Sequence, residues 1–280
     1  MKPKYLTLAD KDKELLTQLH DFIYLDVAFI HKYIYTEYTG GYQSVMQRLK
    51  RLEDFNYVRK FSAPIENIPK ASNIYTLTSF GVEIVEEIQG ITKWNSRWSN
   101  NLLPWYQHQL MLNRIVKDFQ LQAEEIGFEM KEWISETRAT WQYTQEKTDV
   151  IKPDGVIIFG RPDSDKNKAF FIELERSVAK RQNTIRKVLR YNDFLNRDSN
   201  TLLNYDLHVG FEAPVDQWRV LFIGGNERNT KKTLRDIQSI HNAQLDIPLL
   251  VTSKEDFEHN AFGESYYFAL SETPDEKRGL

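Results

Sequence analysis

The chain has 280 residues, of which 41% are hydrophobic and 28% charged, and its formal net charge at pH 7 is −3. This length suits two ordinary domains, and this composition excludes a disordered chain. The net charge neither requires nor excludes a nucleic-acid partner, because binding to nucleic acid needs only a local basic patch. The absence of cysteine excludes cysteine-ligated zinc. Without an apolar run of about 18 residues or the apolar core of a signal peptide, we expect a cytoplasmic protein with no membrane span.

The first ninety residues follow the element order of a winged helix-turn-helix. Apolar spacing predicts a helix over 9–23 and a second helix at about 26–34. A Gly-Gly pair at 40–41 precedes a third helix, and YVRKF and NIYTLT then read as two strands before a last helix, SFGVEIVEEI. In this order the third helix enters the major groove of DNA. We therefore expect residues 1–90 to be a winged helix-turn-helix DNA-binding domain.

The third helix and the strand after it carry a local surplus of positive charge. Residues 41–60 contain five basic and two acidic side chains. A winged helix that only mediates protein contacts is the alternative, but basic side chains at these positions favour DNA. The predicted DNA-binding residues of this domain are Gln47, Arg48, Lys50, Arg51, Arg59 and Lys60.

A polar stretch separates this domain from a second one. We expect a linker at 91–104, a second domain at 105–271 and a polar tail at 272–280. Trp105, Trp133 and Trp141 are predicted to be packing residues. The predicted elements are a helix at 105–128, the strand FEMKEWISE, two strands within 151–177, a helix at about 177–197, the strand VLFIGG, the helix NTKKTLRDIQSIHN and the strand IPLLVTS. This is an α/β order whose middle strands are apolar enough to be buried on both faces.

Three carboxylates lie in or beside the two strands of residues 151–177. Alternation along AFFIELE places Phe171, Glu173 and Glu175 on one face, with the two glutamates roughly 7 Å apart. Asp154 begins the preceding strand and is expected beside them. Converging carboxylates repel one another unless a cation compensates, and Mg²⁺ takes oxygen ligands of this kind. The alternative is a salt-bridge cluster with neighbouring arginine or lysine side chains.

The helix after these strands is predicted to have a basic side. Val178, Ile185, Val188, Leu189 and Leu195 share one arc of the helix, and a separate arc holds Arg176, Lys180, Arg186, Lys187, Arg190 and Arg197. A surface of one sign beside an acidic pocket favours a track for DNA phosphates. The predicted DNA-binding residues here are Lys180, Arg186 and Arg190.

The acidic residues also carry a resemblance. Asp154 within PDG, followed by a strand with Glu173-x-Glu175, resembles the PD-(D/E)xK nuclease core, a restriction-endonuclease-like αβββαβ fold whose acids hold Mg²⁺ for phosphodiester hydrolysis. The wider series of QRLKRLEDFNYV, YTLTSFGVEIV, WYQHQLMLNR with His108, KPDGVIIF, FFIELERS and KVLRY resembles the replication-relaxation family of plasmid and mobile-element proteins, over roughly residues 8–252.

This resemblance implies a DNA-binding protein that acts in plasmid replication, relaxation or mobilisation. Asp154 and Glu173 match the metal ligands of the nuclease motif, whereas Glu175 stands where the motif usually has lysine. In an active site, the three acids would bind Mg²⁺ or Mn²⁺ and activate water, and Lys187 would steady the phosphate.

Two alternatives to this enzyme remain open. One is a non-catalytic relaxosome accessory or transcriptional regulator with a degenerate nuclease fold, and the other is a defence nuclease with a winged-helix specificity domain. Metal-dependent cleavage of DNA would separate the enzyme from the non-catalytic accessory or regulator. The expected partners are double-stranded DNA, a relaxase or replication initiator, and a second copy of the chain in a homodimer.

Overall fold

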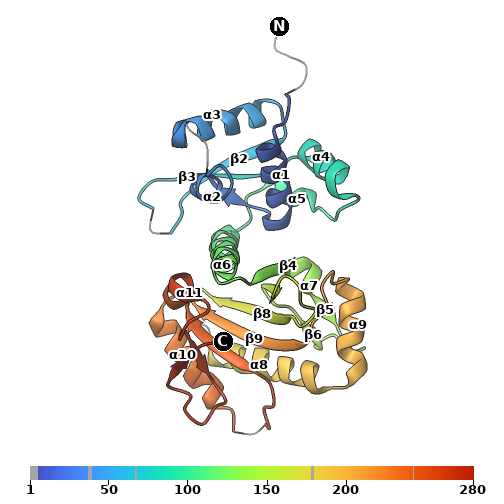
Figure 1. The fold of residues 1–280 in the computed structure, drawn as a ribbon, viewed down its shortest axis with the longest axis vertical. Coiled ribbons are helices and arrows are strands. Elements are labelled where there is room, and N and C mark those ends of the chain that lie inside the picture. The colour runs from blue at the N-terminus through green and yellow to red at the C-terminus, as the bar shows by residue number, and fades with distance from the viewer. Residues whose placement is uncertain (1–5, 37–39, 67, 178–179, 242) are drawn as a thin grey trace. The chain divides into compact units, whose positions relative to one another are not determined.

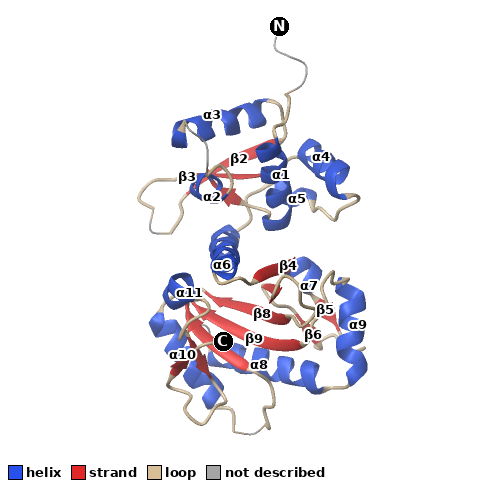
Figure 2. Cartoon of the chain, viewed as in Figure 1, coloured by secondary structure: helices blue, strands red, loops and turns tan. Residues whose placement is uncertain are grey.

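The computed structural model describes residues 6–36, 40–66, 68–177, 180–241 and 243–280. The chain divides into two compact units, Met1–Arg114 and Ile115–Leu280. The boundary falls within the helix α6 (Tyr106–Glu125), shown with the other elements in Figure 1. Each unit combines helices with strands (Figure 2), so the predicted mixed α/β class is confirmed at this level. None of the helices in the described ranges is both long and apolar enough to cross a membrane.

The first unit contains the predicted helices and strands in the predicted order. Its elements are α1 (Asp10–Phe22), β1 (Leu25–Asp26), α2 (Val27–Tyr33), α3 (Gly41–Asp54), β2 (Val58–Ala63), β3 (Ser72–Leu77), α4 (Ser79–Gln89) and α5 (Ser96–Asn100). The two-residue β1 was not predicted; it pairs with β3, so that the sheet order is β1-β3-β2. Val45, Leu49 and Leu52 of α3 are fully buried, which fixes the side of this helix that faces the core.

The expected linker at 91–104 contains α5 and contributes to the core of the first unit. Trp94 and Trp98 pack against a buried cluster that includes Tyr24 and Ile74. The first half of α6 also belongs here, because Asn113 Nδ2 donates to the carbonyl oxygens of Phe22 at 3.1 Å and Tyr24 at 2.8 Å.

The second unit is built on one mixed sheet. Its strands are β4 (Glu129–Ser135), β7 (Gly155–Gly160), β8 (Lys168–Glu175), β9 (Gln217–Gly224), β10 (Leu249–Ser253), β11 (Tyr266–Phe268) and β12 (Lys277–Arg278), in the order β12-β11-β10-β9-β8-β7-β4. β4, β7 and β8 pair antiparallel, whereas β8, β9 and β10 run parallel. The remaining elements are α7 (Glu136–Ala139), β5 (Trp141–Gln142), β6 (Val150–Ile151), α8 (Arg181–Asn196), α9 (Ser199–Val209), α10 (Glu227–Gln238) and α11 (Lys254–Asn260).

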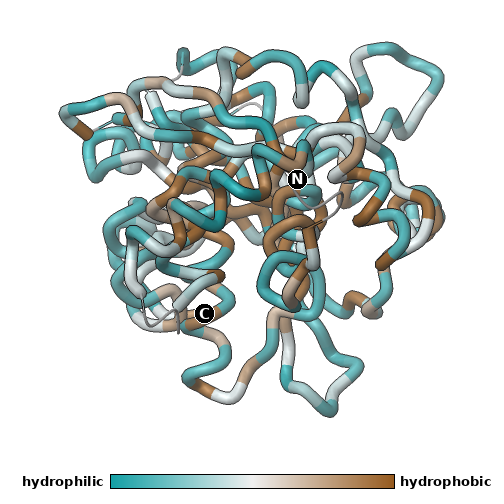
Figure 3. Tube along the Cα trace, turned by 90° about the horizontal axis from the view of Figure 1, so that it is seen from above, coloured by the Kyte–Doolittle hydropathy of each residue, from teal (hydrophilic) through white to brown (hydrophobic). Residues whose placement is uncertain are grey.

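Both faces of the central strands are covered, as predicted. On one face, Phe171 packs with Phe194 of α8 and Tyr205 of α9. On the other face, Phe119 of α6 meets Phe170 of β8. Along the trace, hydrophobic segments alternate with hydrophilic ones (Figure 3), as expected for elements that each bury one side.

Several elements differ from the predictions. The expected polar tail at 272–280 contains β12, which pairs with β11. α8 begins at Arg181, and Val178 lies outside the described residues. The helices α9 and α11 were not predicted. The short pair β5 and β6 was not predicted either, because a two-residue strand is too short to show alternation.

Gly155 of the PDG sequence lies against the Trp133 ring, which leaves no room for a side chain. Gly155 is buried, and a Cβ atom added there would lie 2.0 Å from the Trp133 ring. We expect Gly155→Ala to lower the free energy of unfolding by about 1–3 kcal/mol, because the ring and strand must shift to accept the methyl group. Denaturant unfolding measures this. Gly279→Ala, whose Cβ would meet its nearest atom at 3.6 Å, is the control, and equal midpoints for the two variants would contradict the account.

Candidate functional site

The carboxyl end of β8 brings the two predicted glutamates together with a lysine from α8. Lys187 Nζ lies 2.6 Å from Glu173 Oε2 and 2.7 Å from Glu175 Oε1. The hydroxyl of Tyr191, one turn further along α8, donates to Glu173 Oε1 at 2.6 Å. One ammonium group therefore bridges both carboxylates, and a tyrosine completes the bonding of the more buried one. The alternation predicted for β8 is confirmed, since both glutamates face α8.

Asp154 lies beside this pair, immediately before β7. Its Oδ2 accepts a hydrogen bond from the Leu174 N–H at 2.6 Å, and its own N–H donates to the Ile172 carbonyl at 2.9 Å. These bonds continue the pairing of β7 with β8, in which Gly155 is opposite Ile172. The expectation that Asp154 would sit beside the strand that carries the glutamates is thus confirmed.

The electrostatics of the cluster follow from burial and from the bridging lysine. Burial raises the pKa of Glu173 to about 7 against the opposing charge of Lys187, and the Asp154 carboxylate adds to the rise. Burial alone would lower the pKa of Lys187, but the charges of Glu173 and Glu175 outweigh it and raise that pKa above its ordinary value. Lys187 therefore stays protonated. This is the salt-bridge arrangement that the sequence left open beside a metal site.

A metal ion does not fit the carboxylates in this arrangement. Across the described residues, no group of three or more histidine, aspartate or glutamate side chains is placed to hold a metal ion. Asp154, Glu173 and Glu175 each already accept a hydrogen bond from a protein donor. Binding of Mg²⁺ or Mn²⁺ at Glu173 Oε2 and Glu175 Oε1 would require the ammonium of Lys187 to leave these two oxygens.

In the first unit, Arg48 differs from the prediction of a DNA contact. Its Nε donates to Asp12 Oδ1 at 2.7 Å, its Nη2 pairs with Asp12 Oδ2, and Nη2 also donates to the Thr7 carbonyl at 3.0 Å. Asp12 is 1% exposed and also accepts from the Tyr35 hydroxyl at 2.8 Å. Arg48 thus joins α3 to α1, because a buried carboxylate needs a paired cation.

The other polar residues predicted for DNA contact in this unit are exposed. Arg59 Nη1 donates to Asn100 at 3.2 Å, and Lys60 lies 3.3 Å from Glu53. Of the residues predicted for DNA contact, those on α3 that are exposed and have no side-chain hydrogen bond or ion pair within the described ranges are Gln47, Lys50 and Arg51. The basic surplus at 41–60 is therefore divided between an internal ion pair and a free surface.

The basic side predicted for α8 is divided in the same way. Lys187 faces the sheet and belongs to the acidic cluster, and Arg197 pairs with Asp193 at 2.9 Å. The predicted DNA-binding residues that form no ion pair or side-chain hydrogen bond within the described ranges are Lys180, Arg186 and Arg190.

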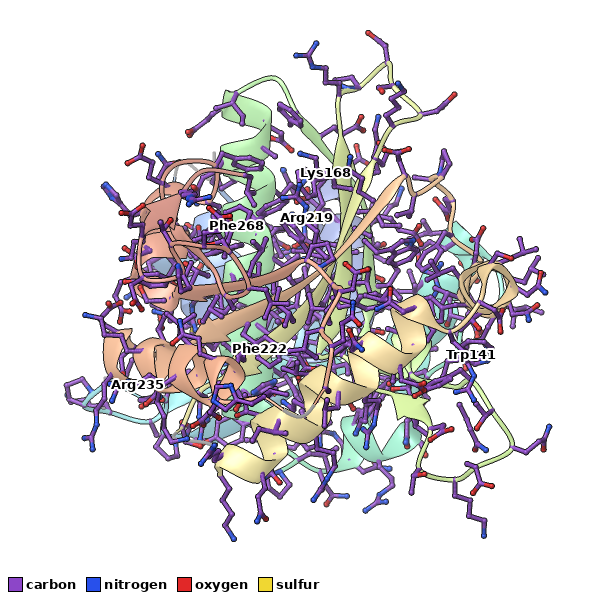
Figure 4. All side chains as sticks on the ribbon, turned by 90° about the horizontal axis from the view of Figure 1, so that it is seen from below. Trp141, Lys168, Arg219, Phe222, Arg235 and Phe268 are labelled. Carbon is purple, nitrogen blue, oxygen red and sulfur yellow. The ribbon has the colours of Figure 1, made fainter. Side chains whose placement is uncertain are left out.

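Two cations on the sheet were not predicted from the sequence. Lys168 on β8 and Arg219 on β9 lie near one another (Figure 4), on the face opposite the glutamates. Burial lowers the pKa of both side chains, and the charge of Arg219 lowers the pKa of Lys168 further. Neither has a carboxylate partner in the described part of the chain. In the sequence, the feature that points to this pair is Lys168, a basic residue at the start of an apolar strand.

One comparison with known proteins gives a match. Residues 16–202 match the model of a family described as replication-relaxation. The matched range includes Lys50 and Arg51 as well as Asp154, Glu173 and Lys187. No curated protein and no solved structure matches the chain.

Arg48 and Arg51 should behave differently when truncated. Arg48→Ala should lower the free energy of unfolding by about 3–5 kcal/mol, because it leaves the buried Asp12 carboxylate without its cation. Arg51→Ala, one turn away on the exposed side, should change it by less than about 0.5 kcal/mol. Denaturant unfolding of the two variants tests the assignment. Similar small losses in both would show that Arg48 is not a structural residue.

Glu173 should make stability depend on pH near neutrality. Its folded-state pKa of about 7 lies above the ordinary value of 4.5, so the folded state binds the proton more tightly. The resulting stabilisation is full below the ordinary pKa and is lost as pH rises through about 7. Glu173→Gln cannot titrate, and its melting temperature should therefore fall less than that of the wild type between about pH 5 and 8. Parallel pH profiles would contradict this assignment.

Proposed function

The chain belongs to the replication-relaxation family, and on that premise we propose that it binds duplex DNA of a plasmid or mobile element during replication, relaxation or mobilisation, without cutting it. The observation that carries this proposal is the exposed side of α3. Gln47, Lys50 and Arg51 extend from it without a partner among the described residues. Cationic side chains that no protein carboxylate neutralises are available to DNA phosphates, and binding releases counterions from the duplex.

We infer that the first unit is a winged helix-turn-helix. In this fold α3 would lie in the major groove, and β2 and β3 would form the wing. Support comes from the element order, from the sheet order β1-β3-β2, and from the buried side of α3, which leaves its opposite side exposed. The pair of Arg48 with Asp12 would hold α3 at a fixed rotation, with Lys50 and Arg51 outward.

For the second unit we propose a restriction-endonuclease-like core in a non-catalytic role. The order α6, β4, β7, β8, α8, β9 follows the αβββαβ pattern once the short elements α7, β5 and β6 and the additional helix α9 are set aside. Lys187 supplies the countercharge that a metal ion would supply in a nuclease. A unit of this kind would act as an accessory that docks on a relaxase or a replication initiator.

A second candidate function is a nuclease that depends on Mg²⁺ or Mn²⁺. One observation favours it: Asp154, Glu173 and Glu175 gather at one end of β8, and Lys187 brings from α8 the lysine that the motif lacks at position 175. In that function Lys187 would leave the glutamates and steady a phosphate. Because each carboxylate already has a protein donor, we rank this candidate second.

The double variant Lys50→Ala with Arg51→Ala tests duplex binding. We expect weaker binding to a labelled duplex and a salt dependence whose slope falls by about one unit for each lost phosphate contact. Lys11→Ala with Lys13→Ala removes the same charge from α1, where each lysine already pairs with a carboxylate, and should bind as the wild type does. Unchanged affinity in the α3 variant, with an intact fold, would identify α3 as a protein-contact surface and end the proposal.

Melting curves with and without Mn²⁺ compare the two candidates. Because Lys187 already compensates the carboxylates, we expect little change in the wild type. Lys187→Met leaves them uncompensated, so Mn²⁺ should raise its melting temperature. A preformed catalytic site predicts instead a large rise in the wild type, abolished by Asp154→Asn, together with cleavage of supercoiled plasmid. The wild-type measurement decides by itself if Lys187→Met does not fold.

A further inference from the structure

The second unit has a pocket between α8 and the segment that contains β5 and β6. Its volume is about 510 Å³, within the range of roughly 300–1,000 Å³ typical of small-molecule sites. Trp141, labelled in Figure 4, begins this segment, and Tyr143, Thr148 and Asp149 from it line the pocket. From α8 the lining residues are Arg186, Leu189, Arg190 and Asp193. The acidic cluster with Lys187 is not part of this lining.

The two carboxylates of the pocket share one cation and each accept a hydroxyl hydrogen bond. Asp193 Oδ2 accepts from the Tyr143 hydroxyl at 2.9 Å and from Arg197 at 2.9 Å. Asp149 Oδ2 accepts from Thr144 at 2.7 Å and lies 3.7 Å from Arg197. Arg197 therefore serves both acids, and neither is left to repel an anionic ligand with its full charge.

The arginines of the pocket have no such compensation. Arg186 and Arg190 form no ion pair and no side-chain hydrogen bond within the described ranges, although two carboxylates line the same pocket. They are separated by one turn of α8, which places their Cβ atoms about 5–6 Å apart. Guanidinium groups present a planar fork of donors that matches phosphate oxygens. The uncompensated charge of the pocket therefore favours a ligand that carries phosphate.

An apolar surface lies beside these two cations. Leu189 is 37% exposed although it is a large hydrophobic side chain, and it lies on α8 between the two arginines. The Tyr143 ring is held in place by its bond to Asp193 and by an edge contact with Phe194 at 5.4 Å between centroids. A fixed aromatic ring and an exposed leucine next to two arginines suit a flat, partly apolar group joined to phosphate. A nucleotide has this composition.

We propose that this pocket binds one unpaired nucleotide of single-stranded DNA, with its base against Leu189 and Tyr143 and the neighbouring phosphates at Arg186 and Arg190. Duplex DNA keeps its bases stacked and paired, so it offers no free base to such a pocket. The inference rests on the proposed DNA-binding function and deepens it: α3 would bind duplex, and the pocket would bind a strand that has been opened. The second unit would then distinguish melted DNA from intact duplex.

Binding of a labelled oligothymidylate of about 12 nucleotides to the full chain, followed by fluorescence anisotropy, tests this proposal. Arg186→Gln with Arg190→Gln should weaken binding by about tenfold or more. Leu189→Ser, which changes no charge, should weaken it by roughly fivefold, because one base loses its apolar contact. The control is Lys231→Gln with Arg235→Gln, which removes the same charge from exposed positions of α10 in the same unit. Arg235 is labelled in Figure 4.

The pattern of results separates this inference from the proposed function. If the arginine and leucine variants bind the oligonucleotide as the wild type does, or if the α10 control weakens binding equally, the pocket proposal is overturned. Duplex binding that still depends on Lys50 and Arg51 would leave the proposed function standing. If thymidine monophosphate binds as tightly as the oligonucleotide, the pocket takes a free nucleotide and the proposal for a strand is wrong. Binding of neither duplex nor single strand by the wild type would overturn both.

Discussion

A single ammonium group between two carboxylates determines the arrangement at the carboxyl end of β8. Glu173 is 2% exposed, and an ionised carboxylate at such a position is costly unless a cation and hydrogen bonds compensate it. Lys187 and Tyr191 provide both from the same side of α8. The rotation of α8 about its axis is thereby fixed, and at 100° per residue this rotation turns Arg186 and Arg190 toward the pocket rather than the glutamates.

The first unit follows the same rule with different residues. Asp12 is buried and needs a cation, and Arg48 of α3 supplies it. Once Arg48 faces inward, Lys50 and Arg51 lie on the exposed side of the helix, where they remain available to a phosphate backbone. In each unit, a buried carboxylate thus determines which basic residue is internal and which ones are left for a ligand. The surfaces proposed for duplex and for single strand are both consequences of an internal ion pair.

The sequence predicts some of this arrangement well. Alternation in AFFIELE places Glu173 and Glu175 on one face, and the helices of the first unit follow from their apolar spacing. Arg48 could not be told from Arg51 in this way, because its partner Asp12 is 36 residues earlier in the chain. Similarly, the helical arc that groups Lys187 with Arg190 does not show that Lys187, at its edge, turns toward the sheet. The β5 and β6 side of the pocket has strands too short to leave a pattern.

A crystal structure of the protein grown with Mn²⁺, with anomalous differences measured for the metal, tests most directly the claim that Lys187 replaces a metal ion. We expect Lys187 Nζ between Glu173 and Glu175 and no anomalous peak among Asp154 and the two glutamates. A manganese peak that bridges Asp154 and Glu173, with the ammonium displaced, would contradict it and would support the nuclease instead.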